Sequence, residues 1–76
     1  MNKQRRKRLS EAESLIADAS AIIEEVAAEE REYLENMPES LQSGEKGQRA
    51  EEVAETLDEV AGMLDEAMSM CAQAAA

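Results

Sequence analysis

NMPESLQSGEKG, residues 36–47, is the clearest helix-breaking stretch in a chain of 76 residues that otherwise favours helix. Pro38 lacks a backbone N–H and cannot sit inside a helix. Gly44 and Gly47 add backbone freedom shortly afterwards. The stretch therefore predicts a turn at about residues 37–44, with a separate helix on either side.

Before this turn, apolar residues recur at alternating steps of three and four, as on one side of an amphipathic helix. The pattern predicts a helix over about residues 3–36. Glu30 is the one charged residue on its inner side; it either fixes the helix register or lies at an edge near Arg31 or Arg49. The expected inner positions are Leu9, Ala12, Ile16, Ala19, Ile23, Val26, Glu30, Tyr33 and Met37.

After the turn, a second helix is predicted over about residues 45–74, with a more regular apolar repeat. At ~1.5 Å per residue, both helices should approach 50 Å. Two long helices of similar length with a short connection form an antiparallel hairpin. We therefore expect a single all-α domain, residues 1–76. The inner positions of its second helix are Ala50, Val53, Leu57, Val60, Leu64, Ala67, Cys71 and Ala74.

The apolar stripes are wider than a two-stranded contact needs, because each occupies three heptad positions where two suffice. The surplus residues are Leu15, Ile22, Leu34, Ala54, Ala61, Met63, Met68 and Met70. Exposed apolar surface of this extent normally marks an interface. We expect a homodimer that forms a four-helix bundle. The expected interface residues are Leu15, Ile16, Ile22, Ile23, Val53, Leu57, Val60, Leu64 and Met68.

Charge is distributed unevenly along the chain. It carries 18 acidic and 8 basic residues, a net charge of −10. Five of the cations form a basic N-terminal segment within residues 1–8: Lys3, Arg5, Arg6, Lys7 and Arg8. Three interpretations are open: this segment binds nucleic acid, it docks on an acidic partner protein, or it compensates the negative C-terminal end of the second helix and pairs with Asp65 and Glu66.

The acidic residues have a plain interpretation as a solvated helix surface. The alternative is an acidic surface that imitates nucleic acid and blocks a host DNA-binding enzyme or defence nuclease. The residues that would carry this mimicry are Glu51, Glu55, Asp58 and Glu59.

Little in the chain favours chemistry. There is no histidine, and Cys71 is the only cysteine, so we expect no disulfide, no metal site, no cofactor and no enzymatic activity. Cys71 itself is expected to pack as a small apolar residue. No apolar run reaches membrane-spanning length, and a cytoplasmic protein without membrane contact is expected.

Residues 30–68, EREYLENMPESLQSGEKGQRAEEVAETLDEVAGMLDEAM, resemble small helical-hairpin proteins from phages and bacteria, in which a leucine–proline–glutamate type of turn precedes an acidic amphipathic helix. The resemblance implies a hairpin and a mobile-element origin, and it implies no activity. The leading expectation is a non-enzymatic protein–protein interaction module that modulates host machinery. The alternatives are the acidic nucleic-acid mimic and a small DNA- or RNA-binding dimer that uses the basic segment.

Overall fold

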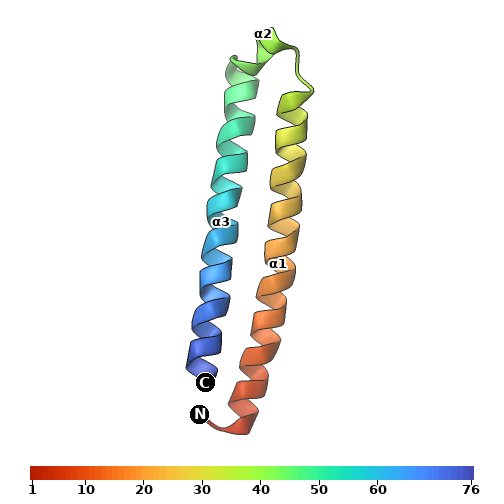
Figure 1. The fold of residues 1–76 in the computed structure, drawn as a ribbon. Coiled ribbons are helices and arrows are strands. Elements are labelled where there is room, and N and C mark those ends of the chain that lie inside the picture. The colour runs from red at the N-terminus through yellow and green to blue at the C-terminus, as the bar shows by residue number, and fades with distance from the viewer.

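The computed structural model describes residues 1–76 as three helices: α1 (Lys3–Glu35), α2 (Glu39–Gln42) and α3 (Glu45–Ala75). The long helices α1 and α3 pack against each other along their length, and α2 lies at the connection between them (Figure 1). The molecule is a rod of 58 × 14 × 12 Å, with both termini at the end opposite α2. The predicted antiparallel hairpin of two long helices is confirmed, and the helix ends lie within one residue of the expected bounds.

The ends of α1 are set by asparagine at both sides. The Asn2 side chain accepts a hydrogen bond from the backbone N–H of Arg5 at 2.8 Å, which satisfies one of the unpaired donors of the first turn. Asn36 is the C-cap. Pro38 then stands at the start of α2, where a missing N–H costs nothing.

The turn is held on the first turn of α3 by a close approach at Gly47. Gly47 is buried, and a Cβ atom placed there would lie 1.9 Å from the carbonyl oxygen of Gln42. The Gln42 amide also donates a hydrogen bond to the carbonyl oxygen of Met37 at 3.1 Å. Only glycine at position 47 therefore allows α2 to sit this close to α3. The Leu41 side chain of α2 takes no part in this close contact and is 56% exposed at the tip.

The contact between α1 and α3 is made by small residues. All six buried residues are small: Ser20 and Ala27 on α1, with Gly47, Ala50, Ala54 and Ala61 on α3. Half-buried residues flank them at steps of seven, at positions 9, 16, 23 and 30 on α1, at position 37 just after it, and at 57, 64 and 71 on α3, in the row of the buried Ala50. A strict seven-residue repeat over this length means that the two helices coil around each other.

This arrangement corrects four of the seventeen predicted inner positions, which are exposed: Ala19, Val26, Tyr33 and Ala74. The positions shared with the prediction are those at the seven-residue steps just named, together with the half-buried Ala12, Val53, Val60 and Ala67. On α1 the other inner row runs through Ser20, Ala27 and Leu34, so that Ala19, Val26 and Tyr33 are exposed. On α3 the other row is 54, 61, 68 and 75, so that Ala54 and Ala61, which were expected outside, are buried. The contact is therefore shifted toward the rows of Ala27 and Ala54, because small side chains let the two backbones come closer.

Candidate functional site: an apolar interaction face

One side of the hairpin is bridged by polar side chains. Arg31 on α1 forms an ion pair with Asp58 on α3, in which Nη1 and Oδ1 lie 3.3 Å apart. The Ser20 hydroxyl donates a hydrogen bond to Asp65 at 3.3 Å. The hydrogen bond to Asp58 and its charge together raise the pKa of the Arg31 guanidinium. We call the side that contains these two bridges the polar flank.

The opposite side of α1 is apolar. Residues two positions apart in an α-helix point ~200° apart, almost in opposite directions. Tyr33 stands two positions after Arg31 and therefore points away from the polar flank. Ile22 has the same relation to Ser20. The four large apolar residues on this side of α1, Leu15, Ile22, Val26 and Tyr33, are all exposed.

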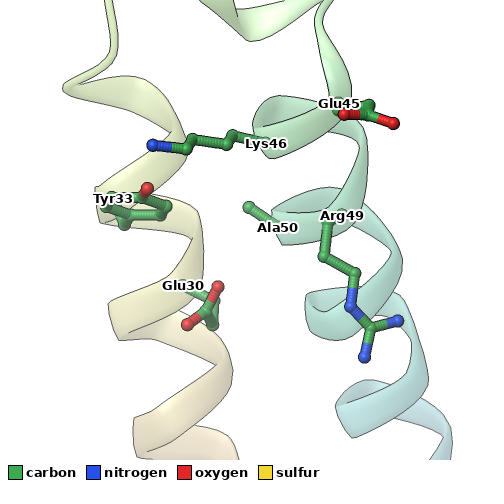
Figure 2. Close-up of a pocket in the computed structure, with 6 residues that line it drawn as sticks. All are labelled: Glu30, Tyr33, Glu45, Lys46, Arg49 and Ala50. Carbon is green, nitrogen blue, oxygen red and sulfur yellow. The ribbon is translucent and has the colours of Figure 1, made fainter.

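Helix α3 repeats this division. Val60 stands two positions after Asp58, and Met63 stands two positions before Asp65, so both point away from the polar flank. Figure 2 shows the same side near the tip, where Lys46 reaches across toward α1 above Tyr33 and Arg49 lies beside Ala50. These residues line one surface pocket together with Glu30. The apolar sides of α1 and α3 therefore belong to a single face of the hairpin.

We call this surface the apolar face. The most exposed of its residues are Leu15, at 69%, and Met63, at 67%, while Val53 and Val60 are half-buried at the edge of the helix contact. Its residues are Leu15, Ile22, Val26 and Tyr33 from α1 and Val53, Val60, Met63 and Met70 from α3.

The predicted interface residues separate into two groups. Four of them lie on the apolar face: Leu15, Ile22, Val53 and Val60. The other five are half-buried along the contact between α1 and α3: Ile16, Ile23, Leu57, Leu64 and Met68. Sequence reasoning missed Val26 and Tyr33 as surface residues, because it placed them in the inner row. The small residues at 20, 27, 54 and 61, spaced by seven, were the signal for the correct rotation.

The charges on the apolar face differ sharply from those on the rest of the molecule. Positions separated by whole heptads share a side of a coiled helix. By this rule Arg5 shares the row of Tyr33, and Arg8 the row of Ile22. On α3, Lys46 shares the row of Val53, and Arg49 that of Met63.

Four of the 8 cations therefore lie on the apolar face, two at each end. Glu29 is the only one of the 18 acidic residues in these rows. The face is thus apolar in the middle and basic at its ends, while the acidic residues lie on the polar flank and the outer sides.

The basic N-terminal segment does not pair with Asp65 or Glu66, but one of its cations does contact the C-terminal end of α3, which is the other part of the compensation considered for it. Arg6 Nε instead donates a hydrogen bond to the carbonyl oxygen of Ala75 at 3.0 Å. The ion pairs in the structure are Arg31 with Asp58 and Arg49 with Glu52. Asp65 lies farther along α3 and is bound by Ser20. The remaining cations of the segment, Lys3, Arg5, Lys7 and Arg8, make no ion pair.

The four acidic residues of the proposed mimic surface lie off the apolar face. All four are exposed, and Asp58 is bound by Arg31. Glu51 shares the heptad row of Asp58 on the polar flank, whereas Glu59 points to the outer side of α3. Three carboxylates, those of Glu51, Glu55 and Glu59, make no ion pair.

The remaining candidates have simple surroundings. Glu30 is half-buried and pairs with neither Arg31 nor Arg49, the two partners considered for it. Cys71 is a free thiol in the half-buried row of α3. No group of three or more Cys, Asp or Glu side chains is placed to hold a metal ion. None of the helices combines the length and the apolar character that crossing a membrane requires.

No protein-family model, curated protein or solved structure matches the chain. The functional interpretation therefore depends on the geometry and charge of the surface.

Proposed function

We propose that this protein is a non-enzymatic interaction module that associates with a second copy of itself through the apolar face. The resulting assembly is a dimeric four-helix bundle in which the hairpins stack face to face. The single observation that supports this proposal is the unpartnered apolar face, which exposes large side chains such as Leu15, Ile22 and Met63 while the fully buried positions within the hairpin hold only small residues.

The energetics support the same conclusion. A hairpin whose buried residues are all small removes little apolar surface from water, and short chains are marginal without further burial. Each large aliphatic side chain that becomes fully buried contributes ~1.5–3 kcal/mol. A second apolar face is the simplest surface that covers Leu15, Ile22 and Met63 at once.

Light scattering coupled to size-exclusion chromatography tests the proposal directly. The expected mass is about twice the 8.3 kDa of the single chain. A folded, heat-stable species of 8.3 kDa at micromolar concentration would contradict self-association. Sedimentation velocity across a hundredfold dilution series gives the dissociation constant.

A second candidate function is the imitation of nucleic acid by the acidic surface, which the unpaired Glu51, Glu55 and Glu59 favour. The resemblance of residues 30–68 to phage hairpin proteins suggests a host DNA-binding enzyme or defence nuclease as the target. Binding should weaken steeply as salt is added. Charge reversal at Glu51, Glu55, Asp58 and Glu59 should abolish it, and binding that survives this change excludes the mimic.

A further inference from the structure

We infer that the second copy docks antiparallel, with α1 on α1, α3 on α3, and the termini of each copy over the tip of the other. This inference rests on the proposed self-association and specifies its geometry. It follows from two observations: the spacing of the large residues on the apolar face, and the separation of charge along the rod.

The spacing on α1 fits a two-fold axis between residues 20 and 21. Such an axis pairs positions whose numbers add to 41, and it sets Leu15 opposite Val26 of the other copy. It also sets Ile22 opposite Ala19, a large residue opposite a small one, which is how facing layers interdigitate. Near the end of α1, Arg8 comes to lie opposite Tyr33.

The spacing on α3 fits the same axis. An axis between residues 61 and 62 pairs positions whose numbers add to 123. Val53 then faces Met70, and Val60 faces Met63. The hydrogen bond from Ser20 to Asp65 places this part of α3 at the level of residue 20 of α1. One axis therefore pairs the apolar residues of both helices.

Apolar pairing alone would also allow the parallel arrangement, in which both tips lie together. There α1 faces α3 of the other copy, with Ile22 opposite Val60 and Leu15 opposite Ala67. Shape and hydrophobicity therefore do not favour either arrangement. The distribution of charge favours the antiparallel one.

The two halves of the rod carry very different charge. The tip half, residues 21–61, has 3 cations and 13 acidic residues, which gives 3 − 13 = −10. The terminal half, residues 1–20 and 62–76, has 5 of each and a net charge of zero. Helices in a bundle lie ~8–10 Å apart, about one Debye length at physiological salt. Parallel stacking places the two tip halves, each with a net charge of −10, against each other. Antiparallel stacking places each acidic tip half against the neutral terminal half of the other copy.

The antiparallel arrangement also supplies partners for the unpaired arginines. Arg8 lies opposite Tyr33 of the other copy, whose ring can accept the guanidinium on its face. Glu29 precedes Tyr33 by about one helical turn, and Glu32 precedes it by one residue. Arg5 lies opposite Asn36, which follows the same two glutamates along α1. The basic end of the apolar face formed by Arg5 and Arg8 thus meets Tyr33 and the neighbouring Glu29 near the tip end of α1.

Charge reversal in the basic segment tests this pairing. Arg5→Glu with Arg8→Glu should raise the dimer dissociation constant at least about tenfold, because it sets like charges opposite each other. The helix itself should persist, since acidic side chains are favourable at a helix N-terminus. The matched control is Lys3→Glu with Lys7→Glu, which makes the same change in net charge on the side of α1 that faces away. Equal effects from the two pairs would overturn the proposed contact.

Rescue by the complementary variant identifies the partner residues. Glu29→Arg with Glu32→Arg should weaken its own homodimer in the same way. An equimolar mixture of the two variants should form a heterodimer about as tight as the unmodified dimer, because each reversed arginine then meets a reversed glutamate. A mixture no tighter than either variant alone contradicts the antiparallel pairing.

A distance measurement separates this inference from self-association itself. Ser40→Cys in a Cys71→Ala background places one spin label at each tip. In an antiparallel dimer the two labels lie near the 58 Å length of the rod, and in a parallel dimer roughly 20 Å apart, about two helix spacings. A monomeric mass contradicts the proposed function, whereas a dimer with the short distance contradicts only the antiparallel arrangement.

Discussion

The apolar face and the polar flank are built from the same two helices, yet they share almost no chemistry. The apolar face carries large side chains that are mostly exposed, whereas the polar flank carries the Arg31–Asp58 ion pair and the Ser20–Asp65 hydrogen bond. The difference teaches that several large apolar residues stay on the surface of this hairpin, while the closest contact between its helices takes only small ones. The fully buried positions of its internal contact hold alanine, serine and glycine, and larger apolar residues such as Leu57 and Leu64 are half-buried around them.

The largest expected effect comes from a charge in the middle of the apolar face. Ile22→Glu should raise the dimer dissociation constant at least about a hundredfold, because two isoleucines per dimer lose ~1.5–3 kcal/mol each. The matched control is Ala21→Glu, one residue away on the outer side of the helix, which should leave the dissociation constant within about threefold. Sedimentation velocity measures both. Similar weakening by the two substitutions would remove the distinction between the faces.

Gly47→Ala changes the close contact between α2 and the first turn of α3, which belongs to neither the apolar face nor the polar flank. The new methyl group would collide with the Gln42 carbonyl, so α2 must move off α3. We expect a loss of ~1–3 kcal/mol in the free energy of unfolding, typical of overpacking. Urea denaturation followed by circular dichroism, at one fixed protein concentration, measures the change. Unaltered stability would mean that the turn is not held by this close approach.

Gly62→Ala is the counterpart on the exposed side of α3, toward the polar flank. Nothing lies within 4 Å of a Cβ atom at this position, so the substitution meets no steric obstacle. Alanine favours an exposed helix interior over glycine by ~0.5–1 kcal/mol. We therefore expect higher stability in the same urea experiment, opposite in sign to Gly47→Ala. A loss of stability would indicate that the polar flank is covered in solution.

The smallest effect is expected at the ion pair of the polar flank. Arg31→Gln should destabilise the fold only slightly, because both partners are about half exposed and water screens their attraction. The pKa of Arg31 is raised in the folded state, so its contribution is complete below its ordinary pKa and is lost only as the pH rises through the raised value. Between pH 6 and pH 9, the stability difference between the two proteins should therefore stay constant. A difference that grows across this range would show that another group titrates with the pair.

Much of the fold could be predicted from the amino-acid sequence alone. Pro38 and the glycines that follow it place the turn, because proline stops a helix wherever the rest of the chain lies. The apolar repeats place both long helices, because their period reflects only the geometry of the helix itself. The presence of a wide apolar surface, and Leu15 and Ile22 within it, also followed from the number of apolar positions per heptad.

The rotation of the two helices was decided only by tertiary packing. Val26 and Ala27 are both acceptable inner residues by their apolar character, and so are Val53 and Ala54. Close approach of the two backbones buried the smaller residue each time, and it left Val26 exposed and Val53 half-buried at the edge of the contact. The same rotation placed Arg5, Arg8, Lys46 and Arg49 around one face. Sequence thus determined which residues form the helices and the turn, while packing between backbones determined which of them a partner can reach.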